Sequence, residues 1–296
     1  MTDDAARARS ARLAALAAVS VVVVVVGYLF AVRTHLGQRL DDVAFARRSA
    51  VTAATTRRTD RFLGTVSAAS LFGVGAAIVL VALARRRVTL AIAAATAMAG
   101  AVLTTEVLKL KILTRPNFGE GAAVAYNTFP SGHSTIGMAL SLGMVMVAPV
   151  RLRRVAVLVA AFTSIAFGTA VLVSGWHRPS DVVSAYFVAF GWFCAVSAVH
   201  ARFEGRRSTS SPAPADGQVS VPFLLAAATG VFALLMFALW KSLGASGLRT
   251  VVYAAPYVAA CIGIDIAGIA VVGAYYVVGR TSPDVTPVAD RVREVL

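Results

Sequence analysis

The chain has 296 residues, of which 58% are hydrophobic and 14% are charged, and its mean hydropathy is +0.77. Soluble globular proteins carry about a quarter charged residues, so this composition excludes a water-soluble enzyme and indicates a membrane protein. The 28 Lys and Arg against 14 Asp and Glu give a net charge of +14. These basic residues mostly separate apolar segments, which indicates membrane topology and not nucleic-acid binding. Cys194 and Cys261 lie in different apolar segments and predict neither a disulfide framework nor a cysteine-based metal site.

Eight segments of the chain are apolar and long enough to be membrane-spanning helices, which need about 20 residues each. They predict an all-α fold, a polytopic transmembrane helix bundle. The first segment is interpreted as a retained anchor and not a signal peptide, because it is long and further helices follow. The expected spans are 13–32, 62–84, 88–108, 135–150, 155–175, 182–201, 221–243 and 251–279.

Arginine clusters set the expected orientation of the bundle. Four of them fall on one side if every segment spans, and the positive-inside rule places that side in the cytoplasm. Both termini are then cytoplasmic, in a multi-pass protein of the cell membrane. The arginine-rich segment 33–61 falls on the outer side and opposes this orientation. Its Leu36, Leu40, Val43 and Arg47 recur at helical spacing, which leaves open a helix along the membrane surface or a solvated basic loop.

Three polar clusters interrupt the apolar sequence, and the expected topology places all three on the outer side. The first, Lys109 to Pro116, follows the third expected helix. Lys109 and Arg115 can neutralise the oxygens of a phosphate, and the arginine offers a bidentate fork. The alternative is that these basic side chains only extend to the membrane interface, as is common at a helix end.

The second cluster, Pro130-Ser131-Gly132-His133-Ser134, lies at the start of the fourth expected helix. Backbone N–H groups at a helix N-terminus favour a phosphate, and Gly132 permits close approach of the backbone. His133 would be placed to protonate a leaving oxygen. Taken alone, this string could also be a simple polar turn.

The third cluster, Gly175 to Asp181, separates the fifth and sixth expected helices. If the sixth helix begins near Arg178, His177 and Asp181 stand at i and i+4 and can touch. A carboxylate there fixes the imidazole tautomer, raises its basicity and leaves the other nitrogen free to attack. The alternative interpretation is an aspartate that only caps the helix beside an interfacial histidine.

Together, the three clusters resemble the type 2 phosphatidic acid phosphatase (PAP2) superfamily of integral-membrane lipid phosphate phosphatases. That family combines Lys…Arg-Pro, Pro-Ser-Gly-His and Ser-Arg…His…Asp in this order. Residues 109–181 carry the corresponding motifs here. The resemblance implies a PAP2-like six-helix catalytic core within residues 1–202 and a reaction that needs no metal ion and no other cofactor.

The resemblance also implies a role for each matching residue. His177 would be the nucleophile that forms a phosphohistidine, Asp181 would orient and activate it, and His133 would be the general acid. The phosphate would be held by Lys109, Arg115, Ser131 and the backbone of Gly132.

The chain departs from the family pattern at two places. Lys109 precedes Arg115 by one residue fewer than usual, which turns it by about 100° on a continuous helix. A local unwinding before Pro116 could restore its aim. The third motif has Ala170-Val171 in place of Ser-Arg, so an arginine that would bind phosphate is missing. Arg178, next to His177, is the candidate to replace it; the alternative is that its side chain only extends to the interface. Losing one charge-assisted contact without a replacement would cost about 1.5–3 kcal/mol.

The sequence therefore predicts a bacterial membrane phosphohydrolase that removes a terminal phosphate from a lipid phosphate or polyprenyl pyrophosphate at the outer face. Its expected partners are that lipid phosphate and the bilayer, with no nucleic acid and no obligate protein partner. The alternative is a non-catalytic or transport protein on the same bundle, which Val171 and the mid-span Asp265 favour. Residues 203–220 are expected to be a flexible cytoplasmic linker, 221–279 two additional helices, and 280–296 a cytoplasmic tail.

Overall fold

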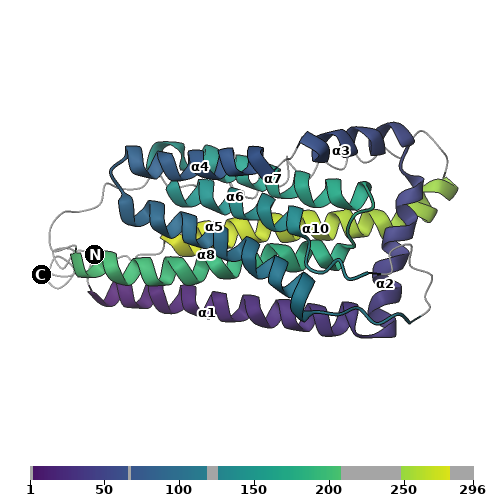
Figure 1. Ribbon diagram of the computed structural model, residues 1–296, viewed down its shortest axis with the longest axis horizontal. Helices are drawn as coiled ribbons and strands as arrows, with labels where there is room; N and C mark the ends of the chain where they lie inside the picture. Colours follow the sequence, from purple (N-terminus) through teal and green to yellow (C-terminus); the bar gives the residue numbers. More distant parts are fainter. Residues whose placement is uncertain (1–2, 66–67, 119–125, 208–247, 281–296) are drawn as a thin grey trace, which may run out of the picture.

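The computed structural model describes residues 3–65, 68–118, 126–207 and 248–280. Within these ranges every regular element is a helix, which confirms the predicted all-α bundle (Figure 1). Five described stretches are long and apolar enough to cross a membrane: Ala6–Val32, Val88–Ile112, Arg153–Val173, Pro179–Phe203 and Val252–Gly279. Two further apolar helices are shorter, Leu71–Ala84 and Gly132–Val147. The expected span 221–243 lies outside the described residues.

The long helices lie side by side, and short helices cover one end of the bundle (Figure 1). In chain order they are α1 (Asp3–Gly27), η1 (Tyr28–Val32), α2 (His35–Ala46), η2 (Arg47–Ala50), α3 (Ala53–Thr65), α4 (Ala68–Ala84), α5 (Val88–Val107), η3 (Leu108–Ile112), α6 (Gly132–Val147), η4 (Val150–Leu152), α7 (Arg153–Val173), α8 (Pro179–Arg207) and α10 (Leu248–Arg280).

Helix α8 is at the centre of the packing, in contact with α1, α5, α6 and α10. Its fully buried side chains recur every three or four residues, as one face of a helix requires. They include Val182, Ala185, Tyr186, Ala189 and Phe193. This central position holds the N-terminus of α8, and the third cluster with it, firmly against the other helices.

Several helix bounds differ from the expected spans. The span expected at 62–84 includes the end of the Thr- and Arg-rich α3, up to Thr65, and α4 from Ala68, with residues 66–67 outside the described ranges. Helix α6 begins earlier than expected, at Gly132, where Ser131 provides the cap. Helix α8 continues to Arg207, into the segment expected to be a linker.

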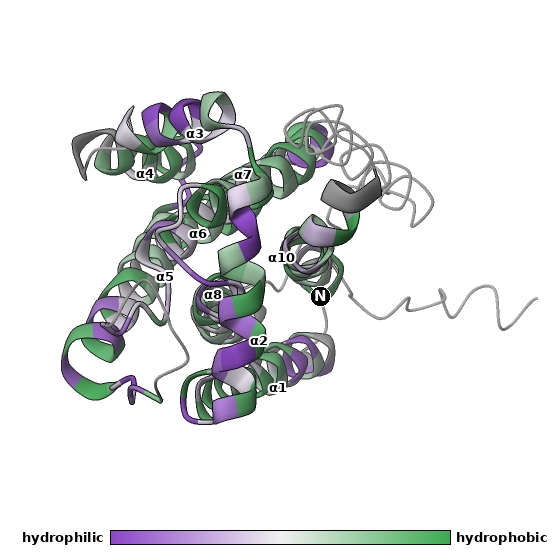
Figure 2. Ribbon diagram, turned by 90° about the vertical axis from the view of Figure 1, so that its right-hand side faces the viewer, coloured by the Kyte–Doolittle hydropathy of each residue, from purple (hydrophilic) through white to green (hydrophobic). Residues whose placement is uncertain are grey.

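Segment 33–61 is largely helical, and α2 lies across one end of the bundle (Figures 1 and 2). Its buried face carries the polar Gln38, Asp41 and Asp42, followed by Ala44 and Phe45 at the end of the helix. Leu36 and Leu40 on the other face are 59% and 57% exposed. In a water-soluble protein a helix buries its apolar face and exposes its polar face, so this part of α2 has the opposite arrangement. Exposed apolar side chains are stable at a membrane surface. The structure thus favours the surface helix over the solvated loop.

All three polar clusters lie at the end of the bundle that α2 covers. Helices α5 and α7 end there, and α6 and α8 begin there (Figure 1). The arginines at 85–87 and 151–154 lie at the opposite end, where α4 ends and α7 begins. Segments far apart in the sequence are therefore brought to one site.

Candidate active site

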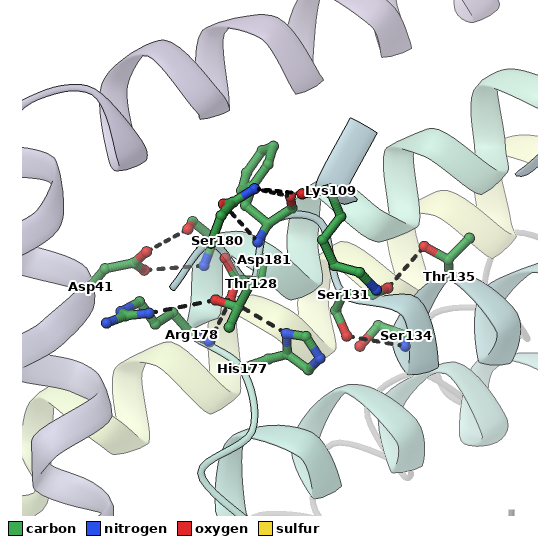
Figure 3. Close-up of polar contacts among 12 residues, drawn as sticks. Asp41, Lys109, Thr128, Ser131, Ser134, Thr135, His177, Arg178, Ser180 and Asp181 are labelled. Atoms are coloured by element: carbon green, nitrogen blue, oxygen red, sulfur yellow. Dashed lines mark hydrogen bonds and ion pairs between the residues drawn. The ribbon is translucent and has the colours of Figure 1, made fainter. Parts of the chain in front are cut away.

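The N-terminus of α8 holds the expected nucleophile and its carboxylate. Because α8 begins at Pro179, His177 and Asp181 stand about one turn apart, and His177 Nδ1 lies 3.5 Å from Asp181 Oδ2 (Figure 3). This separation is longer than an ordinary hydrogen bond, as catalytic contacts often are before substrate binds. The backbone N–H of Arg178 also donates to Asp181 Oδ2, at 2.9 Å. Asp181 therefore both caps the helix and faces the imidazole, so the two interpretations of this cluster are compatible.

The carboxylate of Asp181 is held by a second hydrogen-bond donor, Thr128, which could not be identified from the sequence. Thr128 Oγ1 donates a hydrogen bond of 2.6 Å to Asp181 Oδ2, and both side chains are buried. Two hydrogen bonds on one carboxylate oxygen set its position before any substrate arrives. The carboxylate oxygen that faces His177 Nδ1 is therefore itself held by the protein.

The second cluster is joined directly to the third. The backbone N–H of Ser131 donates to the backbone carbonyl of Asp181 at 3.0 Å. Ser131 is the N-cap of α6, and its Oγ accepts from the N–H of Ser134 at 3.3 Å (Figure 3). Its hydroxyl hydrogen is still available to a ligand. The first-turn N–H groups of α6 therefore face the same region as His177, which suits an anion.

Gly132 and His133 bring the first and third clusters to the start of α6. A Cβ atom at Gly132 would lie 2.9 Å from Glu106 Oε1 and 3.4 Å from Lys109 Nζ, so the absence of a side chain permits this close approach. The ring of His133 packs edge-on against Trp176, with 5.2 Å between ring centroids. His133 thus packs against the residue that precedes His177 in the chain.

The helix around Lys109 departs from α-helical geometry in the segment before Pro116, where a local unwinding could restore the aim of Lys109. Residues Leu108–Ile112 form a π-helical turn, η3, whose wider turn changes the direction of the side chains. Lys109 Nζ pairs with Glu106 Oε1 at 2.6 Å. The ammonium group is therefore held beside Gly132, where the first-turn N–H groups of α6 begin.

Arg115 is the cation of the site with the most unused donors. Its two terminal nitrogens are buried and have no hydrogen-bond partner among the described residues. Burial and the nearby charge of Arg178 lower the pKa of Arg115, and the carboxylates of Asp181, Asp41 and Asp42 partly offset this. Buried N–H groups without partners are costly, and a guanidinium suits the oxygens of a phosphate.

Arg178, the expected replacement for the missing arginine, is held by α2. Its side chain is 1% exposed, and its Nε lies 2.5 Å from Asp42 Oδ1. A second contact joins its NH1 to Thr128 Oγ1 at 3.5 Å. Val171, at the position of the missing arginine, is fully buried in the core. A role of Arg178 in phosphate binding stays a prediction, since its guanidinium already has an acidic partner.

Helix α2 contributes residues to the site that were not singled out from the sequence. Gln38 Nε2 donates to the carbonyl of Pro116 at 2.8 Å, which ties α2 to the first cluster. Asp41 accepts from the backbone N–H of Ser180 at 3.1 Å and also pairs with the Ser180 hydroxyl (Figure 3). Polar residues 38, 41 and 42 at i, i+3 and i+4 were the signal that could have revealed this face.

The carboxylate of Asp41 is in an unusual environment. Burial raises its pKa to about 7, and the neighbouring charge of Asp181 acts in the same direction. The hydrogen bonds from Ser180 and the charge of Arg115 oppose this rise. Asp41 therefore changes its charge close to neutral pH, within the group of residues that holds the N-terminus of α8.

The described residues contain no group of three or more His, Cys, Asp and Glu side chains that could hold a metal ion. The acidic residues described above instead face cations or hydroxyl groups of the protein. The side chains gathered here are two histidines and several groups that can bind an anion.

Comparison with known families identifies the segment that carries this site. The model of the PAP2 superfamily matches residues 89–205, which include all three clusters and the helices that present them. No curated protein and no solved structure matches the chain. Membership in this superfamily suggests phosphatase activity. The domain formed by residues 89–205 therefore belongs to the PAP2 superfamily, as the three motifs indicated.

Proposed function

We propose that the protein is a membrane phosphohydrolase that removes a terminal phosphate from a lipid phosphate or a polyprenyl pyrophosphate. One observation carries this proposal: the His177–Asp181 pair lies at the same end of the bundle as the unpaired guanidinium of Arg115. A nucleophile with a fixed tautomer beside unused anion-binding groups is what phosphoryl transfer requires.

In the first step, Nε2 of His177 attacks phosphorus. The P–N bond forms as the bond from phosphorus to the leaving oxygen breaks, and His133 donates a proton to that oxygen. Asp181 stabilises the positive charge that develops on the imidazole, because its Oδ2 faces Nδ1. The product of this step is a phosphohistidine and a lipid alcohol or lipid monophosphate.

In the second step, water attacks the phosphohistidine. His133, now neutral, takes a proton from the water, the P–N bond breaks, and inorganic phosphate leaves with His177 restored. Arg115, Lys109, the Ser131 hydroxyl and the first-turn N–H groups at Gly132 bind the phosphoryl oxygens in both steps. No metal ion takes part in this scheme.

The orientation that we propose puts the site at the outer face of the cell membrane and both termini in the cytoplasm. Arginine clusters lie at the end of the bundle opposite the site, and the positive-inside rule assigns that end to the cytoplasm. The exposed apolar face of α2 then rests on the outer leaflet, so that a lipid head group in this leaflet is level with the site.

The test is phosphate release by the purified protein in lipid–detergent micelles with EDTA present. The panel contains phosphatidic acid, phosphatidylglycerol phosphate and a polyprenyl pyrophosphate. His177→Ala should abolish release, whereas His200→Ala, in the last part of α8, should not. A radiolabelled phosphoenzyme that is stable to alkali and labile to acid should form in the wild type and not in His177→Ala.

A folded wild-type protein that releases no phosphate from any of these lipids would contradict the proposal. The non-catalytic or transport alternative would then be preferred, and Asp265 would become its focus, since this buried carboxylate bonds to Thr169 in α7.

A further inference from the structure

The third motif lacks its arginine, and the structure brings another arginine to the same loop. Arg48, in η2, packs directly on Gly175, two residues before His177. A Cβ atom at Gly175 would collide with Arg48 Nε and would lie 2.9 Å from its Cζ. The backbone of Gly175 also has a φ of +70°, a conformation that favours glycine. The loop before the nucleophile is thus shaped to accept this guanidinium.

One hydrogen bond and one contact with an aromatic ring hold the guanidinium of Arg48 in place. Its NH1 donates to the carbonyl of Phe45 at 3.0 Å, and its Cζ lies 4.0 Å from the centre of the Phe45 ring. An arginine has five N–H donors, and this hydrogen bond uses one of them. Stacking on Phe45 fixes the plane of the guanidinium while other donors stay available.

The positive charge of Arg48 is not neutralised by the protein around it. No carboxylate lies within ion-pair distance of Arg48 in the part of the chain that the structure describes. Burial lowers the pKa of Arg48, and Tyr257 is the group that opposes this effect. A partly buried cation without an acidic partner is costly, and a bound anion would remove that cost.

We propose that Arg48 supplies the cation that is missing at position 171 and binds the phosphoryl group that His177 receives. This inference rests on the proposed function. Arg178, the replacement expected from the sequence, is already paired with Asp42. Arg48 therefore takes the role of the family arginine from a different helix, and η2 becomes part of the phosphate site.

Arg47 provides a matched control, since it is adjacent in the sequence and has a different environment. Its guanidinium lies over the ring of Tyr253 in α10, 4.0 Å from the ring centre. Removing Arg47 deletes the same charge from the same short helix, without touching Gly175. Any effect of Arg48 that follows only from net charge should therefore appear in Arg47→Ala too.

The experiment measures the binding of orthovanadate and of inorganic phosphate to the purified full-length protein, through the rise in melting temperature with ligand concentration. Arg48→Ala should weaken binding by about 10- to 100-fold, the usual effect of one charge-assisted contact. Arg48→Lys keeps the charge and should fall between Ala and wild type. Arg47→Ala should stay within about twofold of wild type.

A second variant moves the arginine back to the family position. Val171→Arg combined with Arg48→Ala should recover part of the lost affinity, since the charge is restored near His177. If that double variant does not fold, the comparison of Arg48→Ala, Arg48→Lys and Arg47→Ala decides the matter. Equal affinities of Arg48→Ala and Arg47→Ala would overturn the role of Arg48. A wild type that neither binds these anions nor releases phosphate would overturn the proposed function itself.

Discussion

Removal of the carboxylate that holds Arg178 should destabilise the protein. In the structure, Arg178 Nε lies 2.5 Å from Asp42 Oδ1, and the two side chains are 1% and 11% exposed. Asp42→Asn leaves the shape almost unchanged but leaves a buried guanidinium without its counter-charge. Breaking a buried pair in this way costs about 3–5 kcal/mol, and the slight exposure of Asp42 favours the lower end, about 3 kcal/mol.

The assay is thermal denaturation of the purified protein in one detergent. Asp60→Asn is the matched control, because Asp60 is an exposed carboxylate in α3 and its loss should change stability by less than about 0.5 kcal/mol. The double variant Asp42→Leu with Arg178→Met removes both charges and keeps apolar volume. Replacing a whole buried pair in this way is often neutral or stabilising, so the double variant should recover the melting temperature.

Two results would refute this reasoning. One is an Asp42→Asn protein as stable as Asp60→Asn, which would mean that the ion pair contributes nothing. The other is a double variant as unstable as Asp42→Asn, which would show that the loss comes from packing at α2 and not from an unpaired charge. Phosphate release by a stable double variant would also show whether Arg178 itself binds the substrate.

Three further predictions follow from the site. Because the pKa of Asp41 is raised to about 7, its contribution to stability is full below about pH 4 and is lost as pH rises through 7. The melting temperature of Asp41→Asn relative to wild type should therefore rise between pH 5 and pH 7.5, and a constant difference would contradict this. Thr128→Val removes the 2.6 Å hydrogen bond to Asp181 and should lower kcat by about 10- to 100-fold, with little change in melting temperature as the check that folding is intact. Asp265→Asn can retain its bond to Thr169, and phosphate release should stay within about twofold of wild type; a loss comparable to His177→Ala would place Asp265 in the reaction.

The helices and the three clusters could be predicted from the sequence because each depends on local information. Spans follow from apolar length, and the contact of His177 with Asp181 follows from i, i+4 spacing on a helix. The spacing of Lys109 and Arg115 raised the possibility of a local unwinding before Pro116, and the structure has a π-helical turn at Leu108–Ile112. The family match over residues 89–205 agrees with that assignment.

The contribution of α2 could not be predicted because its partners lie far away in the sequence. Asp42 and Arg178 are separated by 136 positions, and the sequence around each residue does not indicate that the two will form a buried ion pair. Leu36, Leu40 and Val43 revealed a helix, yet they mark its exposed face and not its packed one. Arg178 was expected to bind phosphate because it adjoins His177, and only the fold shows that it forms an ion pair with Asp42.

Under the proposed orientation, the reversed amphipathicity of α2 would make the bilayer surface a structural support of the candidate active site. Its apolar face, with Leu36 and Leu40 largely exposed, depends on surrounding hydrocarbon, while its polar face fixes Ser180 and Arg178. A detergent that coats the long spans but leaves this end bare would release α2 while the bundle stays folded. Extraction could then abolish turnover at constant helix content, and returning the protein to lipid would restore it. Inactivity in detergent would in that case mean that the membrane surface is absent, and not that the protein is unfolded.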